Sequence, residues 1–110
     1  MNVTVKDLSA DVIQAKDQDV KRALEIIGLM AEGYAKVHLE QTPRRIDTSR
    51  LQDSIAHKVH DDSVEIGTNV YYGIYVEFGT VKMEANNYLR SAVDDHLKEY
   101  RQVIQEQLQG

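Results

Sequence analysis

A long helical period near the N-terminus is the feature that most limits how this chain can fold. Between Val12 and Glu40, apolar and aromatic residues recur mostly at alternating steps of four and three, the period of an α-helix. They are Ile13, Val20, Leu24, Ile27, Ala31, Tyr34 and His38. Charged residues occupy the other faces, as expected for an amphipathic helix that rests on a core. Pro43 ends the helix, so the rest of the chain must supply the layer beneath it.

The middle of the chain changes to the alternating pattern of β-strands. The stretches "DSIAHKVH" and "SVEIGT" place apolar residues on one face at every second position. Asp61, Asp62 and Ser63 lie between them and favour a short turn, so we predict an antiparallel hairpin. A third strand is expected around Val81 to Met83.

The stretch "YYGIYVEFGT", from Tyr71 to Thr80, fits two structures. Tyr72, Ile74, Val76 and Phe78 alternate as in a strand, whereas Asn69 suits a helix N-cap and Gly79 suits a left-handed helix end. We predict a short helix here, followed by a final helix from about Tyr88 to Gln109. The fold class is therefore α+β.

Length and charge restrict the class of protein. A chain of 110 residues is long enough for one domain, covering residues 1–110, with a flexible N-terminus of about residues 1–10 and a loop at 42–51. The 13 basic and 18 acidic residues give a net charge of −5, which argues against duplex nucleic acid as the main partner. No apolar run is long enough to span a membrane, and we expect synthesis in the cytoplasm.

The residue types that carry catalysis or bind metal are poorly placed. The chain has no cysteine, and its four histidines lack the spacing of a chelating pair, so we expect no metal and no cofactor. Neither a nucleophile elbow nor a glycine-rich phosphate loop is present. Glu77 would suit a general acid if its surroundings raised its pKa. We favour the alternative, in which Glu77 accepts backbone or arginine hydrogen bonds and fixes the turn at Gly79 and Thr80.

The tyrosines divide into two groups. Tyr34 and Tyr100 fall on apolar helical stripes and are best interpreted as core residues. Tyr71, Tyr72 and Tyr75 are too concentrated for all three to be buried in a small core. Composition alone supports a protein-binding surface and an intramolecular cluster about equally.

Several segments, taken in order, resemble one family. Asp47, Thr48, Ser49, Arg50 and Leu51, followed by Ser54 and Ile55, are similar to the Asp-Thr-Gly-x-Leu-x-x-Ser-Ile signature of small neck and tail-completion proteins of tailed bacteriophages, of the lambdoid siphophage type. Ile66, Gly67 and Thr68, and then Tyr72 to Thr80, resemble that family's Val-Gly-Thr strand and its Tyr-Ala-x-Tyr-Val-Glu-Phe-Gly-Thr block. Met83, Ala85, Tyr88, Leu89 and Ala92 resemble its Met-x-Ala-x-Pro-Phe-Leu-x-x-Ala segment.

The chain departs from the family pattern at a few positions. Ser49 replaces a glycine, Gly73 replaces an alanine, and Asn87 replaces a proline. Arg44 and Arg45 lengthen the preceding loop. Glycine inside the Tyr-to-Thr block weakens the prediction of a helix there.

The resemblance implies a structural virion protein with no enzymatic activity, located at the neck or tail. It implies contacts with tail-tube, terminator or connector subunits, and a homo-oligomeric ring in the assembled particle. The binding residues it implies are Asp47, Thr48, Ser49, Leu51, Ser54, Gly67, Thr68, Tyr71, Tyr72, Tyr75, Glu77, Phe78, Gly79 and Thr80. The alternatives are a generic protein-binding or regulatory module outside any virion, and a small hydrolase or isomerase that uses Glu77.

Overall fold

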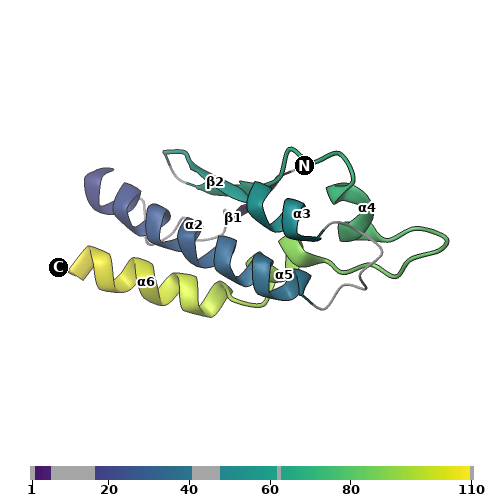
Figure 1. The fold of residues 1–110 in the computed structure, drawn as a ribbon. Helices are drawn as coiled ribbons and strands as arrows, with labels where there is room; N and C mark the ends of the chain where they lie inside the picture. The colour runs from purple at the N-terminus through teal and green to yellow at the C-terminus, as the bar shows by residue number, and fades with distance from the viewer. Residues whose placement is uncertain (1, 6–16, 41–47, 62, 110) are drawn as a thin grey trace.

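The computed structural model describes residues 2–5, 17–40, 48–61 and 63–109, and it has the α+β fold that the sequence predicts (Figure 1). Its strands are β1 (Asn2–Val5), β2 (Ala56–Val59) and β3 (Val64–Gly67). Its helices are α2 (Asp17–Leu39), α3 (Thr48–Ser54), α4 (Gly73–Phe78), α5 (Tyr88–Asp94) and α6 (Leu97–Gln109).

One antiparallel sheet with the order β1-β3-β2 forms a layer against the helices. The predicted hairpin is confirmed as β2 and β3, with His57 opposite Ile66. Val64 and Ile66 are buried beneath α2, whereas Thr4 and Lys58 on the other face are exposed. Figure 1 shows α6 running alongside α2, and α4 near one end of the molecule.

The core is built around the predicted stripe of the long helix. Val20, Leu24, Ile27 and Ala31 are all buried, and Tyr34 packs against them with part of its ring exposed. Tyr100 of α6 is fully buried, which confirms its assignment to the core. The predicted start of this helix, including Ile13, lies outside the described residues.

The predicted position of the third strand was wrong. The third strand is Asn2–Val5, which pairs with β3 so that Val3 lies opposite Ile66. Thr80 and Met83 instead bond to each other, with N···O distances of 2.8 and 3.2 Å, and close a tight turn. Because these backbone groups are already paired, this segment does not extend the sheet.

The final helix is interrupted, although its apolar stripe is continuous. α5 ends at Asp94 and α6 begins at Leu97. The hydroxyl of Tyr100 donates a hydrogen bond to the carbonyl of Ala92, which would accept from the amide of His96 in an unbroken helix. The break also lets the His96 ring stack on Tyr34, with ring centroids 3.6 Å apart.

The segment before the hairpin is more helical than predicted. The loop expected over 42–51 gives way to α3 at Thr48, and α3 continues to Ser54. The strand expected from Asp53 therefore begins only at Ala56. The hydroxyl of Ser54 donates to the carbonyl of Leu51 at 2.6 Å, which satisfies a carbonyl at the helix end.

Candidate functional site: α4 and its supports

The ambiguous stretch forms the predicted short helix. α4 runs from Gly73 to Phe78, although its N-cap is Tyr72 and not Asn69. Gly79 ends it with φ 79° and ψ 176°. The positive φ is as predicted for the end of the helix, but this ψ is extended and differs from that of a left-handed helical residue.

One side of α4 is apolar and exposed. The exposed fractions are 77% for Tyr71, 46% for Ile74, 54% for Tyr75 and 53% for Phe78. Spacings of three, four and seven residues place these side chains on the same side of a helix. The fully exposed Val81 follows in the adjacent turn. We refer to the five residues Tyr71, Ile74, Tyr75, Phe78 and Val81 as the α4 face.

The three clustered tyrosines are therefore not a common core. Tyr71 and Tyr75 are exposed, whereas Tyr72 is partly buried and packs against core residues. The Tyr71 and Tyr72 rings meet edge to face with centroids 5.3 Å apart. This arrangement favours the surface interpretation for Tyr71 and Tyr75, because large exposed aromatics on a short helix and the turn before it are typical of a contact surface.

Glu77 lies on the opposite side of α4 and is fully buried. Its Oε1 accepts a hydrogen bond from the amide of Leu89 at 2.7 Å, and its Oε2 accepts one from the amide of Arg90 at 3.3 Å. These amides belong to the first turn of α5, where backbone N–H groups have no partner within the helix. Glu77 therefore caps α5. The predicted backbone hydrogen bonds are present, but the prediction that they fix the turn at Gly79 and Thr80 was wrong, because they hold the start of α5.

The pKa of Glu77 is raised from its usual value because burial disfavours the charged carboxylate. The two backbone hydrogen bonds act in the opposite direction without cancelling the effect of burial. A raised pKa is also what a general acid requires, but both oxygens already accept hydrogen bonds from α5 and the side chain is inaccessible. The arrangement is that of a structural cap.

The connection from α4 to α5 is also fixed through the backbone. The amide of Asn86 donates to the carbonyl of Val76 at 2.8 Å, and the amide of Asn87 donates to that of Glu77 at 3.1 Å. Asn87 has a left-handed conformation, with φ 57° and ψ 34°. Asparagine tolerates that conformation, which proline cannot adopt because its ring fixes φ near −65°. The asparagine found where the related family has proline therefore suits this backbone.

Asn86 extends the same support to the end of α2. Its Nδ2 donates to the carbonyl of His38 at 3.2 Å, and its Oδ1 lies 2.9 Å from Nδ1 of the same histidine. His38 is thus partly buried at a helix boundary and is hydrogen-bonded there. The C-terminal end of α2, the end of α4 and the start of α5 are held together by these few polar groups.

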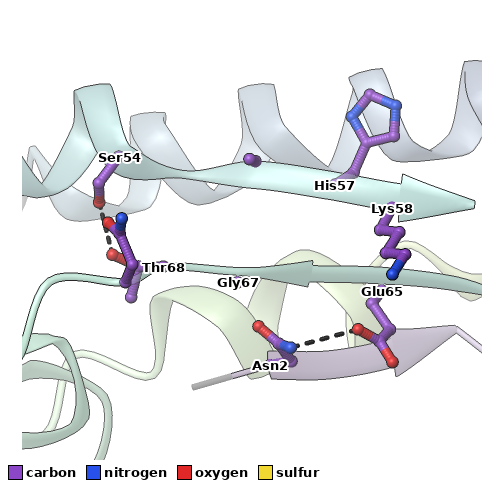
Figure 2. A pocket seen from close by; sticks show the side chains of 9 residues that line it. Asn2, Ser54, His57, Lys58, Glu65, Gly67 and Thr68 are labelled. Carbon is purple, nitrogen blue, oxygen red and sulfur yellow. Dashed lines mark hydrogen bonds between the residues drawn. The ribbon is translucent and has the colours of Figure 1, made fainter.

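Ser54 and Thr68, two of the predicted site residues, meet at the other end of α4 (Figure 2). Their hydroxyl oxygens are 2.5 Å apart, and the Oγ1 of Thr68 also accepts a hydrogen bond from the amide of Val70 at 3.0 Å. This pair joins the end of α3 to the segment that leaves β3. Two motifs separated in sequence therefore form one junction that leads into α4.

Gly73 and Tyr88 occupy adjoining space beside this junction. The hydroxyl of Tyr88 donates to the carbonyl of Gly73 at 3.0 Å, and burial raises the pKa of Tyr88 well above its usual value. A Cβ on Gly73 would lie 2.8 Å from that hydroxyl and 2.7 Å from Cγ2 of Thr68. The related family has alanine and phenylalanine at these two positions, so glycine leaves room here for the extra hydroxyl.

We expect Gly73→Ala alone to lower the free energy of unfolding by about 2 kcal/mol, because the added methyl overpacks the junction. In the Tyr88→Phe background the destabilisation caused by Gly73→Ala should be smaller by about 1 kcal/mol. The hydroxyl that the added methyl would meet is absent there. Urea unfolding of the four proteins of this double-mutant cycle measures the coupling. Strictly additive effects would contradict the packing explanation.

The hollow drawn in Figure 2 lies beside the sheet, and most of the residues that line it have polar side chains. Asn2 donates from Nδ2 to Oε2 of Glu65 at 3.2 Å across its floor. Ser54 and Thr68 border it, and their hydroxyls bond to each other. The hollow thus offers hydrogen-bonding groups, several of which are already bonded to one another.

The remaining predicted site residues have varied positions. Asp47 lies outside the described residues, Thr48 begins α3, and Ser49 is exposed. Leu51 is fully buried and Gly67 is buried at the end of β3. Thr80 is exposed, and its Oγ1 accepts a hydrogen bond from the amide of Lys82 at 3.2 Å.

The sequence patterns did not identify the supporting roles of Asn86 and Arg90. Arg90 places its guanidinium over the Phe78 ring, 5.5 Å from the centroid, and so borders the α4 face. Both residues act across a loop, through contacts that periodicity does not reveal. The glycine in place of alanine at 73 marks a position of close packing between α4 and α5, but it points to Tyr88 and not to these two residues.

The histidines do not form a metal site in the part of the chain that the structure describes, where no group of three suitable ligands comes together. His57 lies between two carboxylates of α2, with Nδ1 2.5 Å from Glu32 and Nε2 2.7 Å from Glu25. Burial lowers the pKa of His57, but these two hydrogen bonds outweigh it and leave the pKa raised. His57 therefore fastens β2 to α2.

An α+β unit with a buried structural carboxylate and an exposed aromatic helix has the features of a structural or binding subunit. Over residues 2–79 the sequence matches the family described as "Bacteriophage HK97-gp10, putative tail-component". The chain belongs to this HK97-gp10-like family, which confirms the resemblance to tailed-phage proteins. Searches of the curated proteins and of the solved structures gave no significant match.

The matched region contains β1 and α4 and ends at Gly79. It includes the whole sheet and most of the α4 face, whereas the α5 amides that Glu77 caps lie after it. No helix in the described ranges is long and apolar enough to cross a membrane.

Proposed function

We propose that this protein is a non-enzymatic structural subunit of the phage head-tail junction, which completes the tail or joins it to the head. The observation that carries the proposal is membership of a family of phage tail components. The order of the Asp-Thr, Tyr-to-Thr and Met-x-Ala segments supports the more specific role, because it resembles that of neck and tail-completion proteins. The subunit is made in the host cytoplasm and functions in the virion.

The α4 face supports a role based on protein contacts. It presents three large apolar side chains from α4, with Tyr71 just before the helix and Val81 in the turn after it. Exposed aromatic side chains supply large contact area at low entropic cost. The contacts proposed are with tail-tube, terminator or connector subunits and with further copies of this chain in a ring.

Deletion of the gene from the phage or prophage that carries it is the direct test. We expect induced lysates to contain DNA-filled heads beside unattached or abnormal tails in negative-stain electron microscopy. Expression of the wild-type chain in trans should restore joined particles. Normal joined virions in the deletion lysate would overturn the proposal and favour a binding module outside the virion.

A surface variant separates the contact role from folding. Tyr75→Ser should fail to restore joined particles in the deletion lysate, while its unfolding midpoint in urea stays close to that of the wild-type chain, because Tyr75 is exposed. Lys98→Ser, at an exposed position of α6, is the matched control and should restore them. If Tyr75→Ser restored joined particles as well as the wild-type chain does, the α4 face would have no part in the proposed contacts.

A further inference from the structure

A second apolar surface lies on the outward side of α2. Leu29 and Val37 are exposed by 58% and 61%, and Gly33 lies midway between them and is also exposed. The spacing of four and eight residues aligns the three along one side of the helix. Buried Ile27, Ala31 and Ala35 lie on the opposite side. We refer to Leu29, Gly33 and Val37 as the α2 stripe.

Gly33 has no packing role within the described part of the chain. A Cβ at this position would have no neighbouring atom within 4 Å, whereas a Cβ on Gly28 would lie 2.3 Å from Cδ2 of His57. Gly28 thus makes room for a side chain of β2, but Gly33 makes room for no side chain of the residues that the structure describes. Glycine in a helix interior is unfavourable relative to alanine, and it is found where another chain approaches the backbone closely.

We propose that the α4 face of one copy packs on the α2 stripe of the next copy, with Tyr75 over Gly33. This inference rests on the proposed function, because it specifies the contact that would build the homo-oligomer. Its occupant is a second copy of this chain. Tyr75 lies near the middle of the α4 face, and Gly33 forms a notch between two projecting side chains.

The two surfaces are complementary in length. At 1.5 Å per residue, Leu29 and Val37 are about 12 Å apart along α2, and the α4 face from Tyr71 to Phe78 extends over about 10 Å. A projecting aromatic opposite a glycine lets two helices approach closely, as when the ridges of one helix fill the grooves of another. The projecting Tyr75 of one surface thus faces the notch at Gly33 of the other.

The charges around the two surfaces are also complementary. Lys82 in the loop after α4 and Arg90 in α5 are exposed beside the α4 face, and Glu84 is exposed in the same loop as Lys82. Glu40, just after the end of α2, is exposed at one end of the stripe. Glu25 is exposed at the other end, and its Oε1 is bonded to Nε2 of His57. Lys36 lies between these two ends on the same side of the helix and is available to Glu84. Opposite charges at the rim of an apolar contact favour the correct register.

The positions of the two surfaces make the contact heterologous. α4 packs against α5 near one end of the molecule (Figure 1), whereas the α2 stripe is exposed on the side of α2 opposite its buried residues. One subunit therefore presents each surface to a different neighbour. Head-to-tail contacts of this kind generate a closed ring when the rotation between subunits closes.

Cysteine cross-linking tests the pairing directly, because the chain has no cysteine of its own. Gly33→Cys and Tyr75→Cys proteins are purified separately, mixed and oxidised, and the double variant is treated in the same way. We expect a disulfide-linked dimer from the mixture and a ladder of higher species from the double variant. Tyr75→Cys mixed with Arg101→Cys, an exposed position on α6, is the control and should remain monomeric.

The same variants are then supplied to the deletion lysate and cross-linked in particles. Absence of the Gly33 to Tyr75 disulfide in both the purified proteins and the particles would overturn the proposal. A strong dimer from Gly33→Cys alone would also overturn it, since that product requires two α2 stripes to face each other. The deletion phenotype tests the junction role independently. If the deletion gives the expected unjoined particles but the cross-link does not form, this interface is overturned and the junction role stands.

A second variant uses opposite effects on folding and assembly. Gly33→Ala should raise the melting temperature of the subunit, because alanine is the better helix residue and nothing obstructs its methyl group. It should weaken self-association by about tenfold, because the methyl fills the notch opposite Tyr75. Sedimentation analysis that finds equal or tighter association would contradict the proposal.

Discussion

Gly79→Ala is expected to lower the free energy of unfolding by about 3 kcal/mol or more. With φ 79° and ψ 176°, Gly79 occupies a backbone region that is nearly restricted to glycine. An added Cβ would also lie 2.7 Å from the amide nitrogen of Ala85 and 2.8 Å from the carbonyl oxygen of Met83. Both atoms belong to the backbone, so the clash could be removed only if the whole turn after α4 moved.

Urea unfolding monitored by circular dichroism measures this effect. Gly33→Ala is the matched control, because it makes the same chemical change in an exposed helical position with open space and should leave the subunit as stable or stabilise it. A Gly79→Ala protein with the wild-type unfolding midpoint would show that the turn is not constrained in solution. An unchanged dependence on denaturant would confirm that the unfolded state is unaffected.

Glu77→Ala is the second substitution with a large expected effect, a loss of about 3 kcal/mol. It removes both acceptors from the amides of Leu89 and Arg90 and leaves a cavity in a fully buried position. Glu77→Gln keeps one carbonyl acceptor and nearly the same volume, so it should lose about 1 to 2 kcal/mol at neutral pH. Equal stability of the alanine and wild-type proteins would contradict the capping role.

The pH dependence of Glu77 has a definite sign. Its pKa in the folded protein is raised above the usual value of about 4.5, so the folded state binds this proton more tightly than the unfolded state. The resulting stabilisation is fully present below the unfolded pKa and is lost as the pH rises through the folded pKa. Glu77→Gln has no proton to bind, so the wild-type chain should gain stability relative to it between pH 7 and pH 4.

Parallel stability curves for the two proteins over that range would contradict the raised pKa. Measuring both proteins in the same buffers removes the contribution of other titrating groups. The Glu77→Gln protein also tests the enzymatic alternative, because its hydrogen bond to α5 is partly retained while the acid is removed.

The two ends of the Tyr-to-Thr block show what its sequence could predict. Gly79 predicted the end of the helix, because only a glycine readily takes a positive φ there. Asn69 suggested the start by residue type alone, but the helix begins after Tyr72. The residue-type preferences of helix caps describe isolated helices, whereas α4 is held by tertiary contacts with α5.

The third strand shows a different limit. Asn2–Val5 has the β-branched residues of a strand, but it is only four residues long and has no hairpin partner beside it in sequence. Its partner β3 lies some sixty positions away, as in the pair Val3 and Ile66. Such a contact is decided by the apolar surface that both strands bury, which local periodicity does not reveal.

The candidate site also contains features that the sequence could predict and features that it could not. The exposure of Tyr71 and Tyr75 was one of two interpretations that composition allowed, and the helical spacing of α4 decides between them. The roles of Gly73 and Tyr88 depend on a contact between α4 and α5, so a sequence pattern identified the unusual glycine without its cause.

The clamp formed by Glu77 has a consequence for recognition. A six-residue helix has little stability in isolation, yet α4 is fastened to α5 by the Glu77 side chain and by the amides of Asn86 and Asn87. A partner that binds Tyr75 and Phe78 therefore meets a helix that is already preorganised, and little conformational entropy is lost on docking. Variants at Glu77 should weaken assembly through this entropic cost even though none of the exposed contact residues has changed.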